Sequence, residues 1–326
     1  MSQEFTNEKV KDSSSKIIFK DPILCAQFLR GYVDIPILKS VKPEGIEDVT
    51  ERYVHMFAEE RNSDVVKKVH IEMNETPFFL VSLIEHKSNV DYNVVMQILR
   101  YMVFIWEDYE KEMERQHRGI SKTKSFKYPP ILPVIFYDGA DNWAAAAELH
   151  ERILFSDMFA KYIPDYQCIL VQLKDYSNAE LLMKKEELSI VMLIDKLKSA
   201  LDYAELNKEI GNEYLTEITA ETPEYLLSII AQVVEILLVK LNVPIEELEA
   251  FTMRIKERKM GELLAHFQGW DVQAIRKESR EEGIEKLVKA MNVVIDSKEA
   301  VAQQLVAQYE LTEEEAAEKV EMYWQS

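Results

Sequence analysis

Two acidic residues and a lysine stand where neighbouring strands could bring them together. Asp64 opens a β-branched, alternating segment, and Glu85 and Lys87 end the apolar segment 78–87. A turn at Asn74 would form a hairpin with Asp64 opposite Glu85, on one face and with Cβ atoms about 4.5–5.5 Å apart. Lys87, two residues beyond Glu85, shares that face.

This arrangement would suit phosphodiester hydrolysis. Two close carboxylates repel each other, and a Mg²⁺ ion or another divalent cation between them removes the repulsion. Mg²⁺ takes one or two carboxylates and leaves positions for water and phosphate oxygens. Asp64 and Glu85 are the candidate metal ligands, and Lys87 would stabilise charge developing on the phosphate. The alternative is a solvated salt bridge between Lys87 and either acid.

A helix over about 91–114 follows the strand and is apolar on nearly every face between 91 and 106. Gln97 and Tyr101 interrupt it four residues apart, so they lie on one stripe. The carboxylate–lysine end of the sheet could supply their partners. Alternatively, the backbone satisfies both side chains.

The composition indicates a globular, reduced, cytoplasmic protein. Of the 326 residues, 47% are hydrophobic, and Cys25 and Cys168 are too few for a disulfide framework. The N-terminus lacks the apolar stretch of a secretory signal. The longest apolar stretch, 225–241, contains charged residues and is predicted to be a buried helix, so no membrane partner is expected.

The net charge of −19 argues against a nucleic-acid partner only if it is evenly spread. Residues 1–128 hold 21 acidic and 19 basic residues, and the remainder holds 37 and 20. Segment 115–127 contains no acid and is either a solvated loop or a DNA-binding strip. Its basic residues are Arg115, Arg118, Lys122, Lys124 and Lys127.

The remaining elements follow from hydrophobic periodicity. Residues 1–20 are polar and expected to be irregular up to about Lys16. Helices are predicted over 21–33 and 46–60, followed by strands over 63–73, 78–87, 128–139 and 166–173. Only helices are expected after about 178, the last three over 275–292, 297–310 and 312–324.

The ordered set of acid, Glu-x-Lys and Gln-x-x-x-Tyr resembles the PD-(D/E)XK nuclease superfamily. More specifically, it is similar to the Rpn family of recombination-promoting nucleases, also described as transposases. The resemblance spans roughly residues 12–175 and rests on "NSDVV" (62–66), "LIEHKS" (83–88), "MQILRYM" (96–102) and "LPVIFYDG" (132–139). Weaker similarities are "DSSSKIIFKDP" (12–22), "FLRGY" (28–32) and "SREEGIEK" (279–286).

The resemblance implies an α/β fold with a PD-(D/E)XK-type mixed central sheet flanked by helices, followed by an all-helical C-terminal region. The expected domains are a nuclease-like core (1–177), a helical domain (178–265) and a charged helical tail (266–326). The implied activity is that of a Mg²⁺-dependent DNA endonuclease linked to recombination or mobile elements. Its implied site is Asp64 and Glu85 as metal ligands, Lys87 as catalytic lysine, and Gln97 and Tyr101 as supporting residues.

Other polar residues lie near these motifs in the sequence. Asp12 and Lys16 match a polar pair of the family, although Asp12 falls in the segment expected to be irregular. His70 and His86 flank the site in sequence and are interpreted as structural, since alternation puts His86 on the opposite face from Glu85.

The alternative function is a catalytically silent nuclease-fold protein that binds protein or DNA. Residues 297–326 contain seven Glu and two Lys, too acidic for a helix-turn-helix that reads DNA. The C-terminal region is therefore expected to join copies of the chain or to inhibit the core. A purely structural helical scaffold would leave the Asp64, Glu85 and Lys87 arrangement unexplained.

Overall fold

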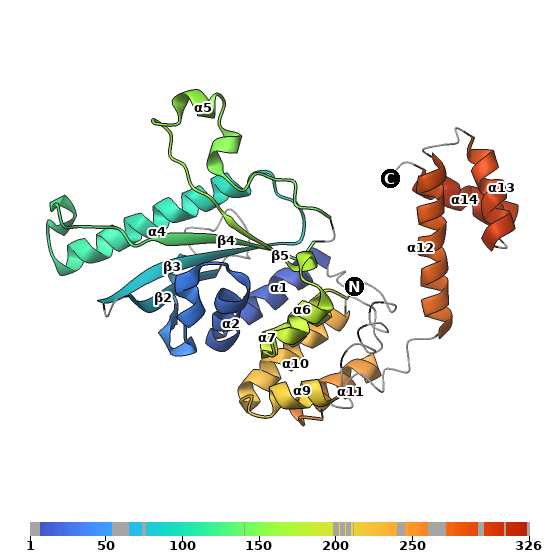
Figure 1. Cartoon of the computed structure of the whole chain (residues 1–326), viewed down its shortest axis with the longest axis horizontal. Coiled ribbons are helices and arrows are strands. Elements are labelled where there is room, and N and C mark those ends of the chain that lie inside the picture. Colours follow the sequence, from blue (N-terminus) through green and yellow to red (C-terminus); the bar gives the residue numbers. More distant parts are fainter. Residues whose placement is uncertain are drawn as a thin grey trace, which may run out of the picture. The chain divides into compact units, whose positions relative to one another are not determined.

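The protein is a mixed α/β protein with a helical C-terminal region (Figure 1). The computed structural model describes residues 7–53, 65–73, 76–139, 141–197, 202, 206, 210, 212–239, 245–259, 272–292, 297–309 and 311–324. The chain divides into two compact units, one of residues 1–196 with 209–263 and one of residues 197–208 with 264–326.

Five strands form one mixed sheet in chain order. The first three pair in antiparallel fashion, and the last three are parallel. The parallel pair β3–β4 requires a crossover connection, which the long helix α4 (Val94–Gln116) supplies. The strands are β1 (Ile46–Asp48), β2 (Val65–Met73), β3 (Thr76–Lys87), β4 (Ile131–Tyr137) and β5 (Ile169–Gln172).

The β2–β3 hairpin has the register that a turn at Asn74 predicts. Val65 pairs with Ile84 at one end and Met73 with Thr76 at the other. Asp64 lies outside the described residues, so the register is confirmed up to Val65 only.

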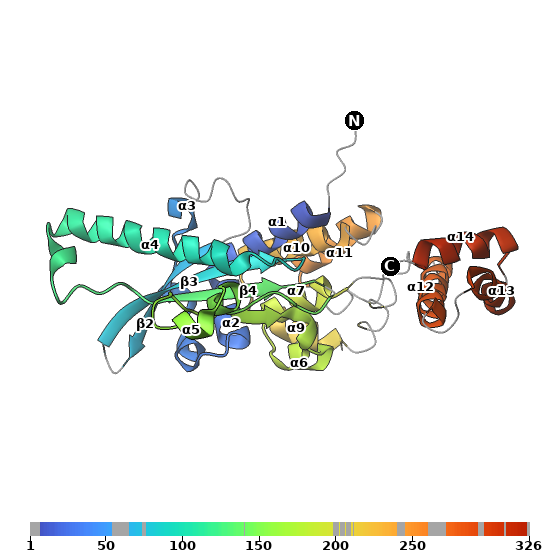
Figure 2. The same ribbon diagram turned by 90° about the horizontal axis from the view of Figure 1, so that it is seen from above.

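Helices cover both faces of the sheet (Figure 2). On one face, α4 (Val94–Gln116) buries Val95, Ile98 and Ile105 against residues that include Val66 and Ile135. On the other face, α1 (Asn7–Lys20) and α2 (Pro22–Tyr32) present aromatic rings to β4. The rings of Phe19 and Phe28 lie 5.7 and 5.6 Å from that of Phe136.

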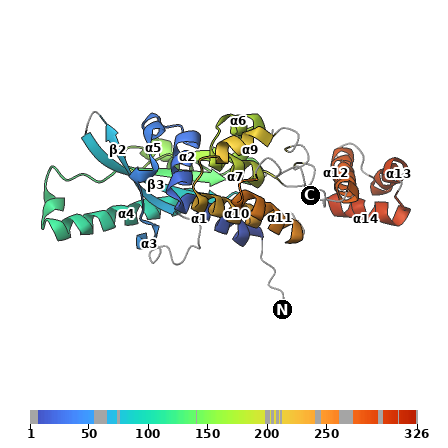
Figure 3. The same cartoon turned by 90° about the horizontal axis from the view of Figure 1, so that it is seen from below.

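Helices beyond the sheet complete the first unit. Among them, α10 packs against α1, α7 and α11, and α7 also contacts α2 (Figures 1 and 3). The helices are α3 (Thr50–Tyr53), α5 (Ser156–Phe159), α6 (Asn178–Met183), α7 (Glu187–Asp195), α9 (Asn212–Thr219), α10 (Glu224–Val239) and α11 (Ile245–Lys256). Short 3₁₀ turns are η1 (Pro36–Ser40), η2 (Pro43–Gly45), η3 (Ile120–Lys122), η4 (Leu149–Arg152) and η5 (Leu173–Asp175).

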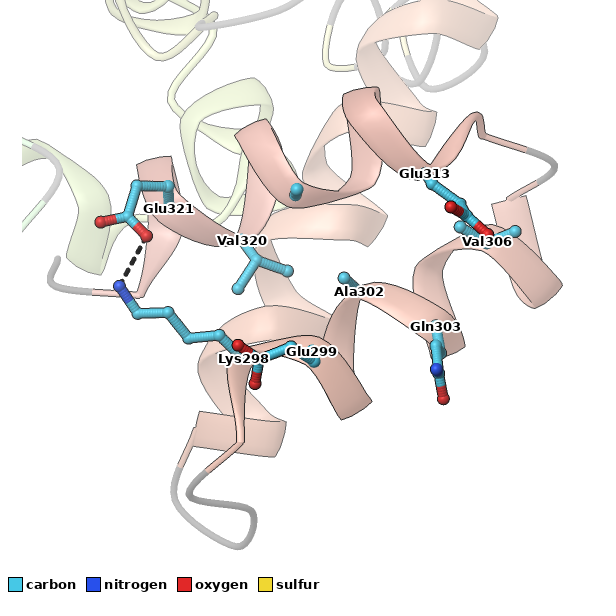
Figure 4. A pocket seen from close by; sticks show the side chains of 9 residues that line it. Lys298, Glu299, Ala302, Gln303, Val306, Glu313, Val320 and Glu321 are labelled. Atoms are coloured by element: carbon cyan, nitrogen blue, oxygen red, sulfur yellow. Dashed lines mark hydrogen bonds and ion pairs between the residues drawn. The ribbon is translucent and has the colours of Figure 1, made fainter.

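The C-terminal helices form a small core of their own. The helices are α12 (Val272–Asn292), α13 (Lys298–Tyr309) and α14 (Glu313–Tyr323). Ile284, Val288, Val301, Leu305 and Val320 are buried together between them. A groove of about 460 Å³ runs between α13 and α14, and Figure 4 shows the ion pair between Lys298 and Glu321 at one end of it.

Most predicted elements are present, but two expectations near the N-terminus are wrong. The segment up to Lys16 is helical in α1 from Asn7 onward, because α1 packs against α2, β2 and α10 and buries Ser14 and Ser15. The helix predicted over 46–60 begins instead as the edge strand β1. Pairing of β1 with β2 outweighs the helical spacing there.

Burial makes both cysteines unreactive. Cys25 and Cys168 are free, and desolvation raises the pKa of each thiol to about 12. Since the thiolate is the reactive form, neither residue is a nucleophile at neutral pH.

A buried lysine fixes β1 to the sheet. Lys67 on β2 is completely buried, and its Nζ lies 2.9 Å from Oδ2 of Asp48. The same Nζ donates to the carbonyl oxygen of Lys20 at 3.4 Å. Asp48 also accepts from the backbone N–H of Thr50, so it connects β1, β2 and the start of α3.

We expect Asp48→Ala to lower the free energy of unfolding by about 3 kcal/mol, because it leaves a buried ammonium without its carboxylate. Urea denaturation of the full chain measures this change. The control is the double variant Asp48→Leu with Lys67→Met, which removes both charges and should recover most of the loss. A loss that persists in the double variant would show that the ion pair is not the cause.

Candidate active site

Two of the predicted catalytic residues, Glu85 and Lys87, lie at the carboxyl end of β3. β3 lies between β2 and β4, and Glu85 pairs with Ile135 of β4. This central position leaves Glu85 with no exposed surface, whereas the Lys87 side chain retains 17% exposure. The strand therefore holds the carboxylate in the interior and its lysine close to solvent.

The first half of α4 covers this end of the sheet. After β3, the chain turns back so that α4 begins at Val94 and runs over the face that carries Glu85. Gln97 and Tyr101 lie one helical turn apart, and both are buried. The helix thereby brings two polar groups to the buried carboxylate.

Four of the five predicted catalytic residues form one connected cluster. The Lys87 ammonium lies 2.8 Å from Oε1 of Glu85 and donates to Oε1 of Gln97 at 3.1 Å. Nε2 of Gln97 donates to Oε1 of Glu85 at 3.2 Å and to the Tyr101 hydroxyl at 2.6 Å. The predicted partnership of the sheet end with Gln97 and Tyr101 is therefore confirmed as geometry. Asp64, the fifth residue, lies outside the described residues.

Asp91 is a member of this cluster that the sequence reasoning missed. Its Oδ2 lies 3.0 Å from the ammonium of Lys87, and its Oδ1 accepts from the backbone N–H of Asn93. In the sequence, the only indication of this contact is that Asp91 follows Lys87 by four residues. It was not informative alone, because the two residues flank a turn and do not share a helix.

The second carboxylate oxygen of Glu85 is left unsatisfied. Oε2 is buried and has no hydrogen-bond partner among the described residues. A buried acceptor without a partner is unfavourable by about 1–3 kcal/mol, and more when it is charged. An ion or a water molecule could satisfy this oxygen.

The pKa values of Glu85 and Lys87 are both raised, for different reasons. Burial raises the pKa of Glu85, and the attraction of Lys87 only partly offsets this effect. Burial would lower the pKa of Lys87, but Glu85 and Asp91 together outweigh burial and raise it. Lys87 is therefore an ammonium at neutral pH, a hydrogen-bond donor and not a base.

The residues present fit a hard divalent cation. Mg²⁺ requires only one or two carboxylates, and the unsatisfied Oε2 of Glu85 is a suitable oxygen ligand. Within the described ranges, no group of three or more His, Cys, Asp or Glu residues could hold a metal by itself. The second predicted ligand, Asp64, falls outside those ranges.

The predicted DNA-binding residues lie at the other end of α4. Segment 115–127, called the basic tip below, comprises the last two residues of α4, the turn at 117–119, η3 and the chain up to Lys127 (Figure 1). All five predicted cations are exposed there. They are Arg115, Arg118, Lys122, Lys124 and Lys127.

The two histidines lie apart from the cluster. His86 contacts the ring of Phe136 on the opposite face from Glu85, as alternation predicts, and its Nε2 lies 3.3 Å from Oδ2 of Asp138. His70 is half exposed, 3.4 Å from Glu47. Helix α1, which carries Asp12 and Lys16, packs on the same face as His86.

The fold and this cluster define a mixed α/β protein with a buried polar site at the carboxyl end of a central strand. A family model described as "Putative transposase, YhgA-like" matches residues 10–224, about two thirds of the chain, and the chain belongs to this family. The matched region contains the whole sheet and the cluster, and it ends at the start of α10. The predicted relation to transposases is therefore confirmed.

Two other comparisons gave no match. Neither a curated protein nor a solved structure is significantly similar to the chain. In the described part of the chain, no helix is both long enough and apolar enough to span a bilayer.

We expect Glu85→Gln to raise the free energy of unfolding at pH 8 by about 0.5–2 kcal/mol, because an amide removes a buried charge. The pKa of Glu85 is higher in the folded chain than in the unfolded chain. The contribution of its protonated carboxyl group to stability is therefore fully present below the unfolded-state pKa of about 4.3, and it is lost as the pH rises through the folded-state pKa. The gain from Glu85→Gln should therefore shrink as the pH falls from 8 to 5.

The matched variant is Lys87→Met, which leaves the carboxylate without its ammonium. It should lower the free energy of unfolding by about 2 kcal/mol, and by more at pH 8 than at pH 5. Urea denaturation at both pH values measures the two effects. A less stable Glu85→Gln protein at pH 8 would contradict the assignment of burial as the dominant influence on Glu85.

Proposed function

We propose that the protein is a metal-dependent DNA endonuclease with the PD-(D/E)XK arrangement of catalytic residues, acting in recombination or on mobile DNA. Membership of a transposase family supports DNA as the substrate. The observation that carries the proposal is the buried Glu85, with one oxygen paired to Lys87 and the other without a partner among the described residues.

In this proposal Glu85 and Asp64 hold a divalent cation, with Mg²⁺ the first choice because both ligands are carboxylates. When bound, the ion would supply positive charge beside the phosphate and a more acidic water. Hydrolysis adds one water molecule to phosphorus and breaks one P–O bond, leaving a phosphate end and a hydroxyl end.

The remaining residues have positioning and electrostatic roles. The Lys87 ammonium stabilises the negative charge that develops on the phosphate oxygens. Gln97 holds Lys87 and Glu85 at a fixed separation through its two hydrogen bonds. Tyr101 accepts the second N–H of Gln97 and so fixes the orientation of the amide. Asp91 holds the ammonium from the solvent-exposed side of the cluster, because its side chain is more exposed than that of Lys87.

We expect purified full-length protein to nick supercoiled plasmid with Mg²⁺ and not with EDTA. Glu85→Gln and Lys87→Met should each reduce the rate at least 100-fold, since each removes a group that acts in the transition state. Gel separation of supercoiled, nicked and linear plasmid measures the rate. Matched controls at exposed positions are Glu44→Gln and Lys42→Met, which should retain wild-type rates.

Equal traces from wild type and both site variants would indicate a contaminating nuclease and favour a DNA- or protein-binding module that lacks catalysis. If metal-dependent nicking survives in Lys87→Met but not in Glu85→Gln, the result would support Glu85 as a metal ligand. It would contradict the proposed role of Lys87.

We also propose that the C-terminal helices join copies of the chain. The groove between α13 and α14 supports this proposal, since Ala302, Val306 and Ala317 line it between charged residues. Light scattering should give a mass at least twice 38.1 kDa. The double variant Ala302→Glu with Ala317→Glu should give the monomer mass, whereas the exposed control Gln304→Glu should not. A monomeric wild type would exclude the proposal.

A further inference from the structure

The basic tip is a folded element and not a loose loop. Gly119 has φ of +84°, a conformation that favours glycine and lets the chain reverse after α4. The Glu114 carboxylate closes this turn by accepting from the backbone N–H groups of Gly119 at 2.6 Å and Ser121 at 2.8 Å. Hydrogen bonds from Ser121 and Gly119 lower the pKa of Glu114 to about 2, so the closing carboxylate is ionised at every physiological pH.

An aromatic ladder holds the returning chain against α4. The ring of Phe126 stacks on Tyr109 at 5.9 Å and meets Tyr128 edge-on at 5.1 Å. Tyr128 in turn contacts Trp106, whose indole N–H donates to the carbonyl oxygen of Pro129 at 2.9 Å. These contacts hold the chain that follows α4 in a defined position, and with it the cations of the basic tip.

The neighbouring acids have partners other than the five cations of the basic tip. On the second half of α4, Glu107 pairs with Lys111, and Arg52 of α3 engages both Asp108 and Glu112. The carboxylate of Glu110 accepts from the Tyr128 hydroxyl, and Glu114 closes the turn. None of the five cations forms an ion pair with a described residue. They are Arg115, Arg118, Lys122, Lys124 and Lys127.

A continuous helix fixes the distance between the basic tip and the catalytic cluster. Gln97 and Arg115 are both in α4, and 18 residues separate them. At 1.5 Å per residue, this separation is about 27 Å. A rise of 3.4 Å per base pair converts that length to about 8 base pairs of duplex DNA.

We propose that the basic tip binds the phosphate backbone of duplex DNA about 8 base pairs from the phosphodiester held at Glu85 and Lys87. This inference rests on the proposed function, because it uses the position of the cleaved bond. Duplex DNA is the substrate class that fits two rigidly separated sites, since it stays straight over far more than 8 base pairs. A flexible single strand could not use the fixed spacing in this way.

Binding is measured by fluorescence anisotropy with the full-length Glu85→Gln protein, which would not cut the probe. The probes are a 24-base-pair duplex, a 6-base-pair duplex and a 24-nucleotide single strand. About five phosphate contacts predict that affinity for the long duplex falls about 500-fold between 50 and 200 mM salt. The short duplex cannot reach both sites and should bind much more weakly.

The test variant changes all five cations of the basic tip to Gln in the same background. Its affinity for the long duplex should change only a few-fold over the same salt range, because the counterion-releasing contacts are gone. The matched control removes the same charge at exposed positions elsewhere in the first unit and should retain the 500-fold salt dependence. Its substitutions are Lys42→Gln, Arg152→Gln, Lys161→Gln, Lys185→Gln and Lys256→Gln.

Equal salt dependence in the test variant and the control would overturn the inference. Equal binding of the single strand and the long duplex would overturn the assignment to duplex DNA. If wild type fails to nick plasmid but binding depends on the basic tip and on duplex length, the proposed nuclease fails and this binding surface stands. If nicking is metal-dependent and the tip variant binds like the control, the nuclease stands and this surface does not.

Discussion

The buried carboxylate of Glu85 is the constraint on which the candidate site depends. A charged oxygen inside a central strand is strongly unfavourable unless cations or hydrogen-bond donors surround it. Lys87 and Gln97 supply both to Oε1, and neither reaches Oε2. A core designed for stability alone would place an apolar residue at this position. In the proposed function, a cation bound to the free oxygen would lower the pKa that burial has raised.

At the other end of α4, the acidic side chains have partners of several kinds. Some of these acids form ion pairs with Arg52 or Lys111. Others accept hydrogen bonds from the Tyr128 hydroxyl or from the turn at Gly119. None of these contacts is an ion pair with a cation of the basic tip, and the five cations are exposed to solvent. A protein with a net charge of −19 can in this way keep one surface that attracts phosphate. In the proposed function, the local distribution of charge, not the total charge, decides where DNA approaches.

The sequence predicted those parts that depend on short-range pattern. The turn predicted at Asn74 gives the observed β2–β3 register, and the spacing of Gln97 and Tyr101 gives their common stripe. The sequence failed where long-range packing decides. β1 is a strand only because β2 lies beside it, and α1 forms because its polar-looking face is buried by neighbouring helices. Asp91 was missed for the same reason, because its partnership with Lys87 depends on how the chain turns after β3.

Helix α4 ties these features together as a fixed spacer. Its first half contributes Gln97 and Tyr101 to the cluster, and its last turn begins the basic tip. Its apolar stripe is pressed against the sheet from Val94 to Ile105, so the helix cannot shift along its axis without disrupting the core. The separation between the Glu85 cluster and the cations of the basic tip is consequently set by the number of residues in one element. If the proposed function holds, such a rigid spacer would select a substrate by stiffness and length, properties that duplex DNA has whatever its base sequence.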